Sequence, residues 1–475
     1  MSALPFTDLT RIHFVGIGGA GMSGIAEILL QPGFDLEVSG CDLQRNAETQ
    51  RLAQLGARVE EGHSPAHLEG IELLVISSAV AEDNAEVREA RRLGIAVARR
   101  AEMLGELMRL KYGIAVAGTH GKTTTTSLVG TVLTEAGLDP TVIVGGRLRL
   151  QGTGARLGRS EYLVAEADEF DRSFLRLTPV VAVVTTIDED HLDTYGDLDA
   201  IREAFVQFAS RVPFFGRVVV GLDDPNVQRI LPRLADRRLV TYGFSPQADL
   251  QAVEVEAHAG GTRFAVRHLQ RGLLGRVELP IPGRHNVANA LAAIGVGLAL
   301  RLPFDVIARG LAGFEGVDRR FEQVGSWRGA AVVDDYAHHP TEVAATLEAA
   351  RQTFPRARLH VVFQPHLFSR TRDQAEAFGR ALLAADRAVV TDVYPSREAP
   401  LPGVTGELVA GAARTSGHRS VVYCRDWHDA PEVLAREVAP GDVVLTLGAG
   451  DIYKLARRLV AEGQPQPAAA EEARA

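Results

Sequence analysis

A glycine-rich loop between an apolar segment and a helical segment is the feature that most constrains the fold of this chain. The loop follows the apolar strand predicted over 112–117 and precedes a helix predicted over 122–136; its residues are Gly118, Thr119, His120, Gly121, Lys122, Thr123 and Thr124. Glycines let backbone N–H groups approach an anion, and a helix start favours negative charge. Position 116 is Val116, so the motif has the shorter GTxGKT form of a phosphate loop. It predicts a nucleotide site at the end of a strand in an α/β sheet.

Lysine is scarce in this sequence, which singles out Lys122. Of the 51 Lys and Arg residues, only Lys111, Lys122 and Lys454 are lysine. A lysine kept where arginine is the rule indicates a need for a compact ammonium. We therefore expect Lys122 to balance the charge of the β- and γ-phosphates of a nucleotide, with the Thr123 hydroxyl on Mg²⁺. The alternative is a structural turn that carries a solvated lysine.

A second glycine loop lies near the N-terminus, between a strand predicted over 11–15 and a helix predicted over 22–30. Gly16, Gly18 and Gly21 form the pattern GxGxxG, and Gly19 lies within it. Asp42 follows about 20 residues later. This spacing is typical of a dinucleotide fold and, alone, favours a nicotinamide dehydrogenase. It fits equally a loop that holds the diphosphate of a nucleotide sugar, or a tight turn for packing.

Acidic residues follow two further predicted strands. Glu166 comes directly after a strand predicted over 162–165, and His191 lies among Asp188, Asp190 and Asp193 after a strand predicted over 180–186. Carboxylates at the carboxyl edge of a sheet suit Mg²⁺. We expect Glu166 to bind one ion and His191 a second, although exposed acidic turns are the alternative, above all for the residues after Glu166.

The whole chain reads as an α/β protein of three domains. Alternating strands and helices predict an N-terminal Rossmann-like domain over 1–110, a central P-loop ATPase domain with a mostly parallel sheet over 111–315, a C-terminal Rossmann-like domain over 316–460 and a disordered tail over 461–475. Further strands are predicted at 36–40, 73–77, 331–334, 359–363, 388–391 and 443–447, and antiparallel strands within 249–279.

Composition limits the classes of function. The net charge of −9 argues against a general nucleic-acid binder. The apolar stretch 287–300 is too short to span a bilayer and predicts a buried helix, and the N-terminus has no pattern of a secretion signal. Cys41 and Cys424 form no disulfide framework. These features together predict a cytoplasmic protein without membrane insertion.

Nine segments resemble motifs of the Mur ligase family, in the wording of its alanine-adding branch. In chain order they are GIGGAGMSGIAE at 16–27, GTHGKTTTT at 118–126, EADEFDRSF at 166–174, DEDHLDTY at 188–195, GRHNVANA at 283–290, RRF at 319–321, DDYAHHPTE at 334–342, FQPHLFSRT at 363–371 and GAGDI at 448–452. The resemblance implies an ATP- and Mg²⁺-dependent ligase that joins L-alanine to the lactyl carboxylate of UDP-N-acetylmuramate through an acyl phosphate, in peptidoglycan precursor synthesis.

The resemblance also implies roles for individual residues. Lys122 and the rest of the loop 118–124 would bind ATP with His285 and Asn289, while Thr123, Glu166 and His191 would bind metal. The reacting carboxylate and the amino acid would meet Arg320, Tyr336, His338 and Arg370, and His338 is a candidate base. The sugar nucleotide would meet the first glycine loop and Asp42, with His63, Ser77 and Ser78 towards the uridine end. The start of the apolar helix at Asn286 is alternatively a simple helix cap.

Two positions depart from patterns found in relatives. Several sister ligases bridge their metals with a carbamylated lysine downstream of the histidine loop, but residues 197–216 contain no lysine. Leu367 stands where some relatives carry arginine, which leaves the choice of amino acid open. A ligase that recycles a preformed peptide and a nucleotide-gated binding protein without turnover remain alternatives. We expect a monomer or a weak homodimer.

Overall fold

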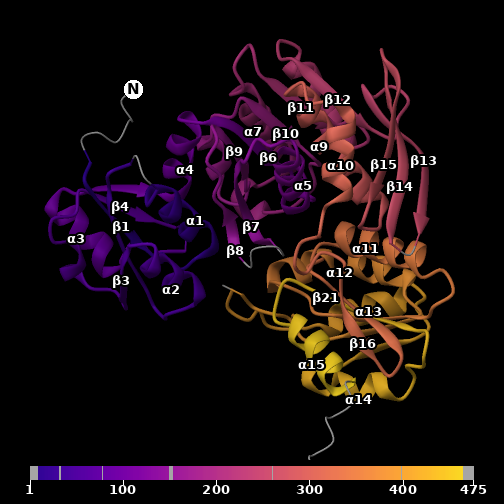
Figure 1. Cartoon of the computed structure of the whole chain (residues 1–475). Coiled ribbons are helices and arrows are strands. Elements are labelled where there is room, and N and C mark those ends of the chain that lie inside the picture. The colour runs from indigo at the N-terminus through magenta and orange to yellow at the C-terminus, as the bar shows by residue number, and fades with distance from the viewer. Residues whose placement is uncertain are drawn as a thin grey trace, which may run out of the picture. The chain divides into compact units, whose positions relative to one another are not determined.

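The computed structural model describes residues 9–31, 34–77, 79–148, 153–258, 260–396 and 398–463. Three β-sheets with flanking helices follow one another along the chain (Figure 1). Two compact units result: the first holds the two N-terminal sheets, and the second holds the third sheet from Arg319 onward. Within the described ranges, no helix is both long and apolar enough to cross a membrane.

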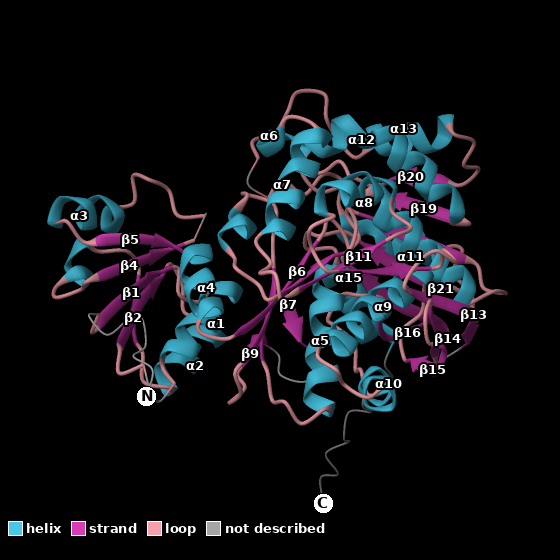
Figure 2. Cartoon of the chain, turned by 90° about the horizontal axis from the view of Figure 1, so that it is seen from above, coloured by secondary structure: helices cyan, strands magenta, loops and turns pink. Residues whose placement is uncertain are grey.

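The first sheet has five strands that all run parallel. In sheet order they are β3 (Arg58–Glu61), β2 (Glu37–Asp42), β1 (Arg11–Val15), β4 (Leu73–Ile76) and β5 (Ala96–Arg99). Figure 2 shows helices on both faces of this sheet; the helices are α1 (Ala20–Leu29), α2 (Ala47–Gln54), α3 (Ala85–Leu93) and α4 (Arg100–Arg109). Apolar residues of α1 and α4 pack in one buried cluster and those of α3 in another, as crossover connections require.

The second sheet has ten strands and is mostly parallel. Its order is β15 (Gly272–Leu279), β14 (Gly261–His268), β13 (Leu250–His258), β12 (Leu239–Gly243), β11 (Arg217–Gly221), β10 (Val181–Val184), β6 (Tyr112–Ala117), β9 (Tyr162–Glu166), β7 (Thr141–Leu148) and β8 (Thr153–Arg156). Strands β7 and β8 pair antiparallel. The neighbours β13, β14 and β15 are joined by connections too short for a parallel crossover, which confirms the antiparallel strands predicted within 249–279.

Helices α5 to α10 belong to this second sheet. They are α5 (Lys122–Glu135), α6 (Leu192–Tyr195), α7 (Leu198–Ser210), α8 (Pro225–Ile230), α9 (Arg284–Ala299) and α10 (Phe304–Ala312). The apolar stretch 287–300 forms most of α9 and is largely buried, which confirms the buried helix expected there.

The third sheet has six strands, of which only β16 and β17 pair antiparallel. The order is β16 (Glu322–Trp327), β17 (Ala330–Asp335), β21 (Val443–Leu447), β18 (Leu359–Phe363), β19 (Arg387–Val390) and β20 (Val421–Tyr423). Its helices are α11 (Pro340–Thr353), α12 (Phe368–Ala381), α13 (Glu407–Thr415), α14 (Ala430–Ala435) and α15 (Tyr453–Gly463).

Helix α15 corrects the predicted start of the disordered tail. Residues 461–463 are helical because Leu455, Ala456 and Leu459 are buried and hold the last turns of α15 against the third sheet. The remainder of the predicted tail, 464–475, lies outside the described residues.

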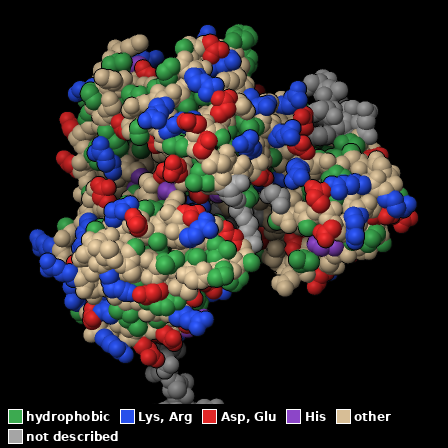
Figure 3. All heavy atoms as spheres, turned by 180° about the vertical axis from the view of Figure 1, so that it is seen from behind, with side chains coloured by type: hydrophobic (Ala, Val, Ile, Leu, Met, Phe, Trp, Pro, Cys, Tyr) green, Lys and Arg blue, Asp and Glu red, His purple; other side chains and the backbone are tan. Residues whose placement is uncertain are grey.

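Charged side chains are mixed over the face of the molecule shown in Figure 3, where acidic and basic groups alternate over short distances. The protein surface also carries exposed ion pairs, such as Arg263 with Glu278 and Arg309 with Asp305. Pairs of this kind contribute little to stability, so the fold depends mainly on its apolar clusters.

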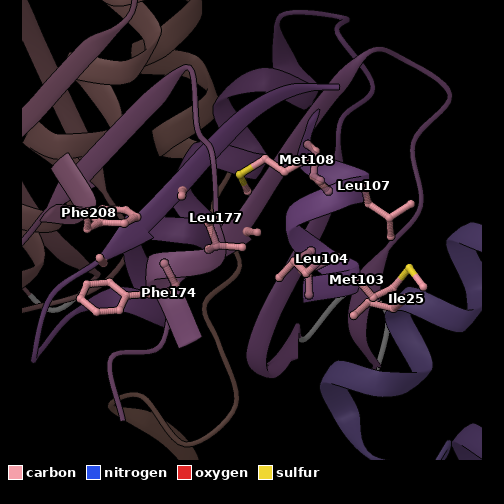
Figure 4. Packing of buried hydrophobic residues seen from close by; sticks show 14 of the residues in the cluster. Ile25, Met103, Leu104, Leu107, Met108, Phe174, Leu177 and Phe208 are labelled. Carbon is pink, nitrogen blue, oxygen red and sulfur yellow. The ribbon is translucent and has the colours of Figure 1, made fainter. Parts of the chain in front are cut away.

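A group of three phenylalanine side chains lies in a buried cluster of the first compact unit. Phe174, in the 3₁₀ helix η2 (Ser173–Arg176), packs on Phe205 and Phe208 of α7, with ring centroids 5.3 and 5.1 Å away. Figure 4 shows Phe174 and Phe208 together with Met103 and Leu104, which belong to the same cluster. Phe174 therefore fixes the chain directly after the acidic segment that begins at Glu166.

We predict that Phe174→Ala lowers the free energy of unfolding by about 3–5 kcal/mol, because it removes a buried ring and leaves a cavity. Phe214→Ala is the matched control: that ring is 81% exposed, and its loss should change stability by no more than about 0.5 kcal/mol. Urea titration followed by circular dichroism measures both. Equal effects of the two substitutions would contradict the packing described here.

Candidate active site

The first glycine loop is held to the end of β2 by backbone hydrogen bonds. The amides of Gly16 and Ile17 donate to the Cys41 carbonyl at 2.8 and 3.0 Å, and the Gly18 amide donates to the Asp42 carboxylate at 2.9 Å. Gly16 has a φ of 77°, which a residue with a side chain rarely adopts. The structure thus brings Asp42 to the loop that precedes α1, as the GxGxxG spacing indicates.

The other residues predicted for the sugar nucleotide are less closely grouped. Gly19 and Gly21 lie at the start of α1, and Ser77 follows β4, whose carboxyl end is level with that of β1. Ser78 lies outside the described residues. The His63 imidazole lies 3.1 Å from the Cys41 sulfur. The binding role of all these residues stays a prediction.

The second glycine loop joins β6 to α5 and is anchored to the next strand, β10. The Thr119 amide donates to the Thr186 carbonyl at 2.9 Å, and the His120 amide to the Thr186 hydroxyl at 3.1 Å. A Cβ atom on Gly118 would lie 1.9 Å from the Thr185 hydroxyl oxygen, and one on Gly121 2.4 Å from the Asn289 side chain. Only glycine fits at either position, where φ is also positive.

Lys122 lies at the start of α5 and bends back over this loop. Its ammonium donates to the carbonyl oxygens of Gly118 and Thr119 at 2.8 and 3.2 Å. It also donates to both carboxylate oxygens of Glu169, at 2.9 and 2.8 Å. Sequence analysis did not predict that Glu169 pairs with Lys122. The signal that could have indicated it is that Glu169 lies three residues after Glu166. A compact ammonium held at a phosphate-type loop can neutralise the charge of a bound anion.

Burial and charge shift the pKa values of this pair. Burial raises the pKa of Glu169 to about 7, although Lys122 opposes the shift. For Lys122, burial works towards a lower pKa, but the carboxylates of Glu169, Asp168 and Glu166 outweigh it and raise the pKa above its ordinary value. Lys122 therefore stays protonated, and Glu169 can gain or lose a proton near neutral pH.

Thr123 and Glu166 meet at the carboxyl edge of the second sheet. The Thr123 hydroxyl donates to Glu166 Oε1 at 3.1 Å, and the amide of Gly145 donates to Oε2 at 2.7 Å. A hydroxyl and a carboxylate beside a phosphate-type loop are the oxygen donors that Mg²⁺ takes. The residues present therefore fit the ion that the sequence predicts.

The loop after β10 is linked to the glycine loop by a histidine and an aspartate. His120 Nε2 lies 3.1 Å from the Asp188 carboxylate. The backbone amide of Asp188 donates to the Thr119 hydroxyl at 2.9 Å. His191 has a φ of 54° directly before α6, and its ring lies edge-on to Phe170 at 5.0 Å. A metal-binding role for His191 stays a prediction.

The residues predicted near adenine lie at the start of α9. Asn289 is buried one turn into the helix, next to Gly121, and its amide donates to the Asn286 side chain at 3.2 Å. His285 is exposed. The packing of Asn289 against the glycine loop supports its predicted place at the nucleotide. The exposed His285 gains no such support, and its role at adenine stays a prediction.

The second compact unit holds a separate group at the carboxyl edge of its own sheet. The guanidinium groups of Arg319 and Arg320 lie 4.9 and 5.1 Å from the centre of the Tyr336 ring. The rings of Tyr336 and His338 are 5.2 Å apart, and His338 lies 5.7 Å from His366, which follows β18. The predicted residues Arg320, Tyr336 and His338 are thus neighbours.

Asp335 supports this group, and sequence analysis did not assign it a role. Its carboxylate accepts hydrogen bonds from the amides of Phe321 and Ala337, at 2.7 and 2.8 Å. Burial raises the pKa of Asp335 to about 6, with Arg320 opposing the shift. Arg370 is buried in the first turn of α12, after Leu367, whose φ is 70°.

Three family models match consecutive parts of the chain. They are described as "Mur ligase family, catalytic domain" for residues 11–112, "Mur ligase middle domain" for 116–297 and "Mur ligase, glutamate ligase domain" for 319–450. A UDP-N-acetylmuramate–L-alanine ligase from Solibacter usitatus is 52% identical over 96% of both chains. The chain belongs to the Mur ligase family. A second such ligase, from Geobacter sulfurreducens, is 50% identical over 96% of this chain and 98% of its own.

Solved structures of Mur ligases have the same architecture. The crystal structure of a UDP-N-acetylmuramate–alanine ligase from Thermotoga maritima matches with a TM-score of 0.78 and 30% identity, over 95% of this chain and 98% of the other. A murein peptide ligase from Psychrobacter arcticus matches with a TM-score of 0.67 and 24% identity, over 95% and 98%. The three-domain α/β fold of the family, expected from the motifs, is thereby confirmed.

We predict that Glu169 makes the stability of the protein fall as pH rises from about 4.5 to about 7. The folded-state pKa of Glu169 lies above its ordinary value, so the folded state holds a proton that the unfolded chain has released. The stabilisation is complete below pH 4.5 and is lost through pH 7, and amounts to at most about 3 kcal/mol.

Glu169→Gln removes this titration and should flatten the pH dependence of unfolding in that window. Glu256→Gln, at an exposed carboxylate on β13, is the control and should leave the slope as in the wild type. Chemical denaturation at a series of pH values measures the slope. An unchanged slope in Glu169→Gln would show that Glu169 does not titrate as described.

Proposed function

We propose that the chain joins L-alanine to the lactyl carboxylate of UDP-N-acetylmuramate at the expense of ATP, in peptidoglycan precursor synthesis. Relatives 50–52% identical along nearly the whole chain carry this activity in their names. The observation that carries the proposal is the Lys122 site: a buried ammonium on a glycine loop, next to a hydroxyl and carboxylate that suit Mg²⁺. A nicotinamide dehydrogenase needs no such second phosphate site.

The domains share this work in our proposal. Residues 1–110 bind the sugar nucleotide through Gly16, Gly18, Gly19, Gly21 and Asp42. Residues 111–315 bind ATP through the loop 118–124 and Asn289, and residues 316–460 bind the amino acid and the reacting carboxylate. The Gly18–Asp42 hydrogen bond and the Arg320–Tyr336 contact support the first and last assignments. A cytoplasmic location and a monomer or weak homodimer stay predictions.

The proposed reaction has two steps. A carboxylate oxygen of the sugar attacks the γ-phosphorus of ATP, and ADP leaves as the acyl phosphate forms. The neutral amine of alanine then attacks the acyl carbon, loses a proton and displaces phosphate, so that an amide bond forms. Mg²⁺, when held by Thr123 and Glu166, supplies charge neutralisation at the phosphates.

The chain's own side chains provide alignment and charge. Lys122 stabilises negative charge on the transferred phosphoryl group, because its ammonium already lies against the loop that would hold that group. Arg320 and Arg370 orient carboxylates, a task that suits a planar guanidinium. His338 Nδ1 lies 3.1 Å both from Glu342 Oε2 and from the Tyr336 carbonyl oxygen, and a role of His338 as the base that accepts the amine proton stays a prediction.

We predict that Lys122→Ala lowers kcat/KM for ADP formation on the order of 10³-fold, because it removes the cation from the transferred phosphoryl group. Lys454→Ala is the control, since this lysine is 54% exposed on α15, and it should retain activity. ADP release is measured with UDP-N-acetylmuramate and L-alanine. Full activity in Lys122→Ala would overturn the proposed role of the loop.

The same assay identifies the substrates. ADP should form only when UDP-N-acetylmuramate and L-alanine are both present. Activity with a preformed tripeptide in place of alanine would assign the chain to peptide recycling. ATP binding without turnover under any of these conditions would mark a binding protein, and ADP release independent of both additions would remove the ligase proposal.

We predict that Glu166→Gln raises the Mg²⁺ concentration needed for half-maximal activity by on the order of 10-fold or more, since the ion would lose an anionic oxygen. Glu161→Gln, an exposed residue at the opposite end of β9, is the matched control. Titration of ADP formation with MgCl₂ compares them. The same Mg²⁺ requirement in both variants would exclude Glu166 as a ligand.

A further inference from the structure

Four metal-ligating side chains meet inside the first domain, and none of them belongs to a glycine loop. They come from four elements: His13 from β1, Cys41 from β2, His67 from the 3₁₀ helix η1 (Pro65–Leu68) and Glu86 from α3. We call them the His–Cys–Glu cluster. His13, Cys41 and Glu86 are fully buried, and one potential ligand atom from each of the four residues lies within 4.8 Å of the others. None of these four side chains has a role in the function proposed above. The neighbouring His63 is predicted to lie towards the uridine end of the sugar nucleotide.

Glu86 lies at the centre of the cluster. Its Oε2 atom is 3.4 Å from His13 Nε2 and 3.2 Å from the Cys41 sulfur, while its Oε1 atom is 2.8 Å from His67 Nδ1. Ligands at the Zn²⁺ bond lengths of about 2.0–2.3 Å are separated by about 3.3–3.8 Å in a tetrahedron. The contacts of Glu86 are close to these separations, and because all four ligand atoms lie within 4.8 Å of one another, adjustment of the side chains would let them surround one ion.

The position of His13 Nε2 is a second observation that points to a cation. The Ser39 hydroxyl donates to the Ile12 carbonyl at 3.3 Å, so it accepts from His13 Nδ1, which lies 2.8 Å away. The neutral imidazole then carries its lone pair on Nε2. That atom is completely buried, makes no hydrogen bond and faces the Glu86 carboxylate. A cation between His13 Nε2 and Glu86 Oε2, either a proton or a metal ion, would compensate the burial of both atoms.

We propose that His13, Cys41, His67 and Glu86 bind a divalent transition-metal ion of the zinc class. Imidazole, thiolate and carboxylate are the ligands of such ions, whereas Mg²⁺ takes oxygen alone. Thiolate and carboxylate together would cancel the ion's charge, which makes burial of the site favourable. His67 is partly exposed, so the ion can reach the site without unfolding of the domain.

A metal ion at this site would also affect the first glycine loop. The carbonyl of Cys41 accepts the amides of Gly16 and Ile17, and the next residue, Asp42, accepts the amide of Gly18. An ion on the Cys41 sulfur would fix β2 directly behind this loop and join it to β1, η1 and α3. It would thus act as a structural ion that stabilises the first domain.

Cobalt binding tests the proposal on the full chain. Purified protein freed of metal by a chelator is titrated with Co²⁺, and a thiolate-to-cobalt charge-transfer band is expected with visible bands of a tetrahedral ion. The chain has only two cysteines, so Cys41→Ser should abolish the charge-transfer band and Cys424→Ser, the matched control, should retain it. Cobalt at the predicted Mg²⁺ site cannot produce this band, because that site has no sulfur ligand.

Zinc provides the second measurement. Zn²⁺ should displace the cobalt bands and raise the Tm of the wild type, and His67→Ala should weaken Zn²⁺ affinity by on the order of 10- to 100-fold or more. His428→Ala, at an exposed histidine, should not. A wild type that shows no charge-transfer band, or one that persists in Cys41→Ser, would overturn the proposal and leave the cluster as a proton-bridged network. Neither outcome affects the proposed ligase activity.

Discussion

An ammonium that is largely removed from water must be balanced by negative charge, and this requirement organises the glycine loop of the central domain. Lys122 is 14% exposed and meets that requirement through Glu169 and two carbonyl oxygens of its own loop. An incoming triphosphate would compete with Glu169 for the same ammonium. Because the pKa of Glu169 is about 7, this carboxylate can take up a proton when it loses its partner, which lowers the cost of the exchange. The ion pair thus keeps the loop in shape and yields to a stronger anion.

Parallel strands explain why residues far apart in the sequence meet at this point. Strands β6, β9 and β10 lie side by side and run in the same direction, so the loops after them share one edge of the sheet. Lys122, Glu169 and Asp188 each follow one of these strands. Hydrogen bonds from the glycine loop to Thr186 fix the loop to the end of β10. The His120–Asp188 contact is a further link between the same two segments.

The sequence predicts those parts of the fold that have a strong local signal. Strands with continuous apolar runs, such as 112–117 and 359–363, have the bounds that were expected. Edge strands such as β3, with the sequence RVEE, were missed because they bury little and lack an apolar run. Strand β11, with the sequence RVVVG, was also missed although it is buried, because no recognisable motif lies beside it.

The candidate sites also differ in whether a local sequence signal predicts them. Glycine loops are contiguous in sequence, so the loop 118–124 and its lysine could be predicted. The partnership of Lys122 with Glu169 depends on which loops share a sheet edge, and no spacing encodes it. The His–Cys–Glu cluster is a stronger example, because its members are spread over four elements and become a group only once the order β2, β1, β4 is known. Sequence reasoning had treated Cys41 only as an unpaired thiol.

The proposed ligase residues are split between two compact units, and this split has a chemical meaning. Lys122, Thr123 and Glu166 belong to the first unit, whereas Arg320, Tyr336 and Arg370 belong to the second. An acyl phosphate needs phosphate-binding groups at one end and a positioned amine at the other. If each set serves one end, neither unit alone can form the amide, and a unit that held the activated acyl group by itself would expose it to water.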